Sequence, residues 1–204
     1  MVLACADSND DRIVRVLTED DRLVPAVAKF ARKQSKRRAG PIQPLTLQQI
    51  ALTQRDRYDL ARVDRSVTLY SFAPLKADLR RYALASTMAE VTLHMVAEHG
   101  QEPGIFALLE RAWQRLDNPA HAPIEELLLL FELRLLQGTG TLPPFETLSN
   151  LSEAAQHTLE GWLVGRWQRL PEGEVRGVAY VLEALISDAS GRQLKSRIFL
   201  NDVM

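Results

Sequence analysis

The segment from Arg12 to Lys29 reads RIVRVLTEDDRLVPAVAK, and it decides the fold of the N-terminal part of the chain. Val14 and Val16 share one face of the run before the polar turn EDD, and Val24 and Ala26 share one face of the run after it. A two-residue period interrupted by a turn of hairpin length is typical of paired β-strands. We therefore predict antiparallel strands over 12–18 and 22–29.

Three further strands are expected around this hairpin, over Val2–Ala6, Pro44–Thr53 and Arg57–Val63. The apolar positions of the long run change phase near Gln48-Gln49, which indicates a β-bulge. Five short strands within about seventy residues favour a small antiparallel barrel.

From Pro74 onward the apolar residues recur every three or four positions, which is the period of an α-helix. The fourteen residues Ile124–Gln137 include nine apolar ones on almost every face, so this helix should be central and buried. The predicted fold class is α+β, with a barrel domain at 1–70 and an all-helical domain at 71–204 that should fold alone. Helices are expected from Pro74 to about Gly100, and over Ile105–Leu116, Ile124–Gln137, Ser152–Trp167 and Val175–Leu185, before a short tail, Arg192–Met204.

Composition narrows the class of protein. The chain has 204 residues, 46% of them hydrophobic and 25% charged, which is typical of a globular protein and excludes wholesale disorder. Apolar runs such as Leu127–Phe131 are far shorter than a membrane span, and no signal peptide is evident. A single cysteine allows no internal disulfide, so we expect a reducing, cytoplasmic setting and no membrane partner.

Little in the sequence indicates catalysis. We expect Cys5 to be a structural thiol, and the four histidines include no pair at the i, i+4 spacing of a helical metal site. The acidic pairs Asp10-Asp11 and Asp20-Asp21 fall in polar turns, where solvated turn residues are the simpler reading. We predict no enzyme activity, no metal and no cofactor.

Positive charge gathers in the N-terminal part. Residues 1–75 hold thirteen Lys or Arg against nine Asp or Glu, whereas residues 76–204 hold twelve against seventeen. Six cations fall within ten residues and no acid lies among them, and we call this set the basic segment: Lys29, Arg32, Lys33, Lys36, Arg37 and Arg38.

The basic segment has two readings. It can be a solvated loop, or, between two barrel strands, it can hold the phosphates of a nucleic acid, for which arginine is well suited. The predicted barrel offers only Phe30 and Tyr58 for stacking on bases. Binding should therefore depend on phosphate charge and show little sequence specificity.

The order of several short motifs resembles the RecO family of bacterial recombination mediators. The likeness runs through Asp11-Arg12-Ile13-Val14, Ala28–Lys33 and Leu45-Thr46-Leu47, continues in Leu79–Glu90 and Leu127–Leu136, and ends at Gly191–Arg197. It leaves out about 138–174, where many family members carry a four-cysteine zinc module that this chain lacks. Phe30 also stands where the family often has glycine.

The resemblance implies an oligonucleotide-binding (OB-fold) barrel that binds single- and double-stranded DNA and anneals complementary strands. It also implies a role in the RecF/RecO/RecR-type repair pathway, with RecR and the C-terminal tail of the single-strand binding protein (SSB) as partners and a nucleoid-associated location. The family's closing motif adds Arg192, Lys195 and Arg197 as candidate DNA contacts, although capping or solvated charge fits them as well. Arg134, in the apolar central helix, is the candidate contact for the acidic SSB tail, unless it forms an ion pair with Glu90 or Glu132.

Two other classes of function remain open. The chain can be an adaptor that does not bind DNA and docks repair partners through its helical domain. A nuclease or other hydrolase with an accessory barrel is the third class, and the lack of a catalytic cluster in the sequence makes it the weakest.

Overall fold

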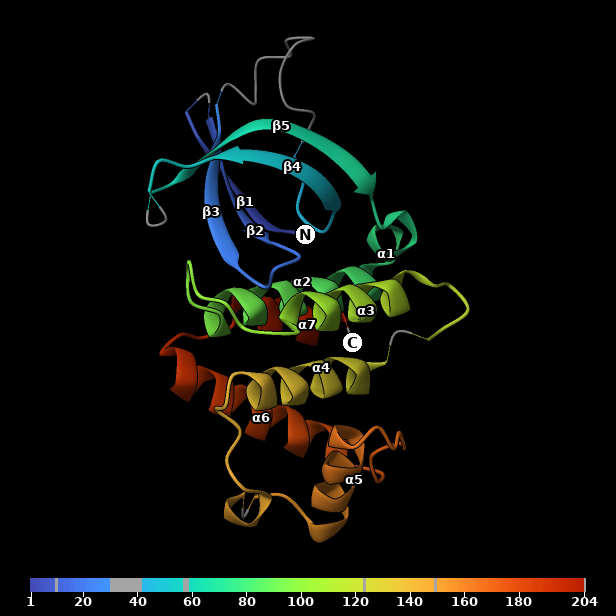
Figure 1. Cartoon of the computed structure of the whole chain (residues 1–204). Helices are drawn as coiled ribbons and strands as arrows, with labels where there is room; N and C mark the ends of the chain where they lie inside the picture. The colour runs from blue at the N-terminus through green and yellow to red at the C-terminus, as the bar shows by residue number, and fades with distance from the viewer. Residues whose placement is uncertain (10, 30–41, 57–58, 123, 149, 204) are drawn as a thin grey trace.

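Five strands follow one another in the N-terminal part of the computed structural model, which describes residues 1–9, 11–29, 42–56, 59–122, 124–148 and 150–203 (Figure 1). Neighbouring strands lie in the order β1-β2-β3-β5-β4, and only β3 and β5 run parallel. The strands are β1 (Val2–Ser8), β2 (Asp11–Leu17), β3 (Leu23–Ala28), β4 (Leu47–Thr53) and β5 (Ala61–Tyr70).

The sheet coils until its first and last strands nearly meet. The amide of Val2 donates to the carbonyl of Thr46 at 2.9 Å, and the amide of Leu45 donates back to Val2 at 3.0 Å, just before β4 begins. This bridge makes the sheet OB-like, although the barrel is not closed by a continuous ladder. The predicted α+β class and OB-fold are thus confirmed, with the barrel partly open.

The bulge predicted near Gln48-Gln49 is present, since the register of β4 against β5 shifts between Leu47 and Gln48 and again between Ala51 and Leu52. The predicted position of the fifth strand was wrong: β5 covers Ala61–Tyr70 instead of Arg57–Val63. Its length is set by pairing with all of β4, out to Leu47 opposite Tyr70, and such a non-local contact cannot be identified from the local sequence.

The rest of the described chain is helical. The predicted first helix is divided into two by Asp78, which has extended backbone angles and whose carboxylate caps α2 by accepting the amides of Arg80 and Arg81. The predicted tail is also helical, as α7. The elements are α1 (Ala73–Ala77), α2 (Leu79–Met95), α3 (Ile105–Asp117), α4 (Glu125–Gly138), the short 3-10 helix η1 (Phe145–Thr147), α5 (Glu153–Leu163), α6 (Glu174–Ser190) and α7 (Lys195–Val203).

The helices form layers beneath the sheet (Figure 1). Helices α2 and α3 lie next to the strands, α4 and α6 lie farther away, and α5 lies at the end of the molecule opposite β4 and β5. Helix α4 is buried on most of its surface, as predicted for the central helix, and packs against α2, α3, α5 and α6. None of the helices in the described ranges is long and apolar enough to cross a bilayer.

One hydrophobic core is shared by the sheet and the helices. Leu17 is the last residue of β2 and Leu23 is the first residue of β3. Both belong to the same buried cluster as Phe72, Leu109 and Trp113. A second, smaller cluster fills the inside of the sheet, around Val14 and Ala26. The boundary near residue 70 stays a prediction, and the shared core means that cutting there would expose apolar surface on both sides.

Asp21 also joins the two parts of the chain. It lies in the β2–β3 turn with a positive φ of 61°, and its carboxylate accepts the backbone amides of Gly104 and Phe106 at 2.8 Å each. These amides belong to the first turn of α3, where Gly104 supplies no capping side chain. The sequence reading of Asp21 as a solvated turn residue was therefore incomplete, because the turn caps a helix 83 residues away.

Replacing Asp21 by alanine should lower the free energy of unfolding by about 1–2 kcal/mol, because a cap and a charge at a helix N-terminus are lost together. Chemical denaturation of the full chain measures this change. Asp20→Ala is the matched control, since the Asp20 carboxylate is about half exposed and contacts Thr18 and Arg22 on the surface; it should cost less than about 0.5 kcal/mol. Equal effects of the two variants would contradict the capping role.

Candidate nucleic-acid interface

The residues on either side of the segment 30–41 lie at one rim of the sheet. Lys29 directly follows β3 and is exposed, while Ile42 is only 3% exposed and belongs to the core inside the sheet. Arg12 pairs with Ala28 across β2 and β3, and its guanidinium donates to the carbonyl of Ile42 at 2.9 Å. The chain therefore leaves the sheet and returns to it beside the same side chain.

Of the six cations in the basic segment, only Lys29 lies in the part of the chain that the structure describes. Arg32, Lys33, Lys36, Arg37 and Arg38 lie outside the described residues, as do the aromatic residues Phe30 and Tyr58. Their assignment as DNA contacts stays a prediction that rests on the charge run and on its place in the chain between Ala28 and Ile42.

Arg12, which contacts the chain on both sides of the segment 30–41, adds little free positive charge to the rim. Arg12 pairs with Asp7 at 2.7 Å, and this hydrogen bond is the main reason that the pKa of Arg12 is raised. Cys5 lies nearby and donates its thiol to Ile42. Burial raises the pKa of this thiol to about 11, so the thiolate is scarce at neutral pH and the position does not favour a nucleophile.

Two exposed cations of the sheet were missed by the sequence analysis. Arg55 follows β4 and Arg65 lies within β5, and no ion pair is recorded for either one in the described ranges. Arg65 was overlooked because the fifth strand was predicted to end at Val63. A correct strand boundary would have placed it on the sheet, opposite Ala51 of β4.

The three C-terminal cations do not share one environment. Arg192 and Lys195 are exposed before and at the start of α7, where a phosphate could reach them. Arg197 is buried and donates to both carboxylate oxygens of Glu132 at 2.5 and 2.6 Å. Its buried position does not suit a phosphate contact, so we exclude Arg197 from the proposed DNA contacts.

Arg134 forms neither of the ion pairs considered from the sequence. Glu132 pairs with Arg197, and Glu90 accepts the amides of Lys195 and Ser196 at the start of α7. The Arg134 guanidinium instead donates to the carbonyl of Trp162 at 2.8 Å, and its buried Nε has no hydrogen-bond partner. Its charge is thus not neutralised by a carboxylate in the described structure.

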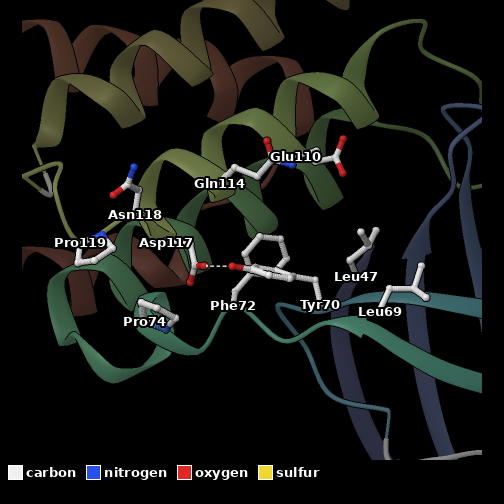
Figure 2. A pocket seen from close by; sticks show the side chains of 10 residues that line it. All are labelled: Leu47, Leu69, Tyr70, Phe72, Pro74, Glu110, Gln114, Asp117, Asn118 and Pro119. Atoms are coloured by element: carbon white, nitrogen blue, oxygen red, sulfur yellow. Dashed lines mark hydrogen bonds between the residues drawn. The ribbon is translucent and has the colours of Figure 1, made fainter.

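A groove of about 680 Å³ lies elsewhere, between the end of β5, α1 and α3 (Figure 2). Tyr70 points across it and donates to Asp117 at 2.7 Å, and Asp117 also accepts the amide of Leu75. Glu110 and Asp117 line this groove and Arg134 does not, so it suits neither a phosphate nor an acidic tail held by Arg134. The groove is lined by Leu47, Leu69, Tyr70, Phe72, Pro74, Glu110, Gln114, Asp117, Asn118 and Pro119.

The fold is an OB-like sheet packed on a bundle of helices, and the basic segment falls in the chain between two residues of the sheet rim, Ala28 and Ile42. These features define a two-part OB-fold protein. Comparison with known families is consistent with this architecture on both sides of the junction. Residues 6–72 match the family model described as Recombination protein O N terminal, and residues 76–157 match Recombination protein O C terminal. The chain therefore belongs to the RecO family, a family of DNA repair proteins.

Individual relatives agree with the family models. The chain is 31% identical over 150 residues to the DNA repair protein RecO of Myxococcus xanthus, and 33% identical over 144 residues to that of an Anaeromyxobacter species. These matches cover 73% and 70% of this chain, but only 60% and 56% of the two relatives. The chain thus spans less than two thirds of the length of the relatives it matches.

Proposed function

We propose that this chain is a DNA-binding recombination mediator without enzymatic activity. It would bind single- and double-stranded DNA, anneal complementary strands and help to load recombinase onto SSB-coated single strands. The observation that carries the proposal is the basic segment, whose cations lie among no acids and which falls in the chain between Ala28 and Ile42, two residues placed beside Arg12 at the rim of an OB-like sheet. Membership in a family of DNA repair proteins supports it.

The proposed DNA contacts are Lys29, Arg32, Lys33, Lys36, Arg37 and Arg38, with Arg192 and Lys195 as additional candidates. The proposed partners are RecR and the acidic SSB tail, which Arg134 would bind through its uncompensated cation. The proposal includes no metal or cofactor, and in the described residues no three His, Cys, Asp or Glu side chains gather as a metal site. A location at the nucleoid follows from the proposed DNA binding.

The second candidate function is an adaptor that docks repair partners without binding DNA. Two observations favour it: the helical part has a net negative charge, and the groove beside β5 presents acids rather than cations. The two functions predict different results for DNA binding at varied salt. A mediator that contacts phosphates releases counterions and should lose affinity as salt rises, whereas the adaptor makes no such contacts.

A titration of labelled single strands and duplexes by fluorescence anisotropy tests the proposal. With about five phosphate contacts, the log–log slope of affinity against salt should be roughly −3.5 for a single strand and roughly −4.5 for a duplex. Single-strand affinity should then fall about 100-fold between about 50 and 200 mM salt. Absent or salt-independent binding would make the adaptor the better reading.

A further inference from the structure

Trp167 is exposed in a way that the other tryptophans are not. It follows α5 and is 48% exposed, whereas Trp113 and Trp162 are 0% and 1% exposed. Its ring stacks on Trp162 with centroids 4.9 Å apart and an angle of 17° between the planes. One face of the indole is thus covered by a core residue, and about half of the side chain remains open to solvent.

The loop that carries Trp167 is held in place by hydrogen bonds to α5. The amide of Arg166 donates to Gly161 at 2.8 Å, and the indole N–H of Trp162 donates to the carbonyl of Gln168 at 2.8 Å. The Gln168 side chain donates to Thr158 at 3.0 Å. A Cβ at Gly161 would lie 3.3 Å from the Arg166 carbonyl, so glycine permits this close approach. The exposed ring is therefore positioned before any ligand arrives.

Two arginines flank this tryptophan in the sequence. No acid occurs in the chain between Glu160 and Glu172, and Arg166 and Arg169 flank the tryptophan. Arg166 is exposed, and no ion pair is recorded for it in the described part of the chain. Arg169 pairs with Glu126 at 2.6 Å but keeps 64% of its side chain exposed. The Arg134 guanidinium donates to the backbone carbonyl of Trp162, the residue on whose ring Trp167 stacks.

We propose that Trp167, flanked by Arg166 and Arg169, is a stacking contact for a base of single-stranded DNA. A flat aromatic face combined with nearby cations is the combination by which proteins hold single strands without reading their sequence. The site rests on the proposed function for its ligand, but it lies outside both family matches, which end at residue 157. It also supplies the aromatic contact that the sequence analysis sought only in the barrel.

The geometry favours a single strand over two other ligands. In a duplex, the bases are already stacked on one another and offer no free face, so the duplex should not use this ring. An acidic peptide with an aromatic end would need a pocket that encloses its side chain. Trp167 instead presents an open ring, and the groove of Figure 2 is lined by other residues.

Tryptophan fluorescence of the full chain tests the site directly. Because Trp113 and Trp162 are buried, iodide should quench mainly Trp167. Adding oligo(dT) should quench the emission further and protect it from iodide, whereas a duplex should do neither. Trp167→Ala should weaken single-strand binding about 10-fold and leave duplex binding unchanged, while Trp167→Phe, which keeps an aromatic face, should retain most of the affinity. Tyr180→Ala is the control, because Tyr180 is an aromatic residue on α6 that is 71% exposed.

Three results would overturn the inference. The first is oligo(dT) binding to the parent without any change in its fluorescence. The second is equal loss of single-strand and duplex affinity in Trp167→Ala, which would indicate a change in folding. The third is protection by an acidic, phenylalanine-ended peptide but not by oligo(dT). In the first case DNA still binds, so the proposed function stands and only this site fails; if the parent binds no DNA at all, the proposed function itself fails.

Discussion

Replacing Arg197 by methionine should lower the free energy of unfolding by about 3–5 kcal/mol. The Glu132 carboxylate is fully buried in α4, and both of its oxygens accept from the Arg197 guanidinium of α7. Removing the cation leaves this carboxylate without its compensating charge in a region of low dielectric. Chemical denaturation of the full chain measures the loss, and the midpoint should fall without a large change in slope.

Two matched variants separate the buried charge from lost packing. Arg197→Met combined with Glu132→Met removes both charges, and it should recover most of the stability because apolar replacements of buried pairs are often neutral or better. Arg15→Met breaks an ion pair with Glu98 whose two side chains are 43% and 46% exposed, and it should cost no more than about 1 kcal/mol. A loss in Arg197→Met as small as that in Arg15→Met would contradict the role given to the buried pair.

The effect of Arg197→Met should also depend on pH. Burial is the largest cause acting on Glu132 and raises its pKa from an ordinary 4.5 to about 7, against the opposing effect of Arg197. Without Arg197 the pKa rises further, so the folded variant holds a proton that the unfolded chain releases above about pH 4.5. Stability is then fully present below that pH and is lost as pH rises through 7 and beyond. The difference from the parent should be larger at about pH 8 than at about pH 5.5.

Local periods in the sequence were sufficient for the elements that depend on local patterns. Alternation in β2 and β3 and the all-round apolar character of α4 identified these elements, and the phase change near Gln48 identified the bulge. Helix α7 was read as a tail because it is short and polar. Its position depends on Glu90, which caps it from α2, and on Glu132 in α4, and neither contact has a local signal.

The candidate site shows the same division. A run of cations is visible in any sequence, so the basic segment could be predicted, together with its place between two strands. The environment of a single cation could not be predicted. The sequence around Arg197 is that of a surface residue, and its burial depends on Glu132, which lies 65 residues away in the chain. Trp167 was missed for a related reason: its exposure follows from the way in which its loop folds back on α5.

Reversing two charges of the basic segment should have the largest effect on DNA binding. Arg37→Glu combined with Arg38→Glu should weaken binding to every DNA sequence about equally, because phosphates carry no sequence information. Because the double variant no longer neutralises about two of the phosphates, the salt slope for a single strand should become shallower by roughly 1.4. Folding should stay nearly intact, since surface substitutions usually change stability by less than about 0.5 kcal/mol.

The control must carry the same change in net charge at another place. Arg111 and Arg115 are exposed on α3, outside every proposed contact, so Arg111→Glu with Arg115→Glu matches the charge change. If the net charge of the molecule determines DNA affinity, both double variants should lose affinity alike. If the basic segment binds the phosphates, only the Arg37/Arg38 variant should show the shallower salt slope. Binding of the SSB tail peptide should survive in both and fall in Arg134→Ala. Full low-salt DNA affinity in the Arg37/Arg38 variant would mean that the basic segment is a solvated loop, and the adaptor would then be the better account of this chain.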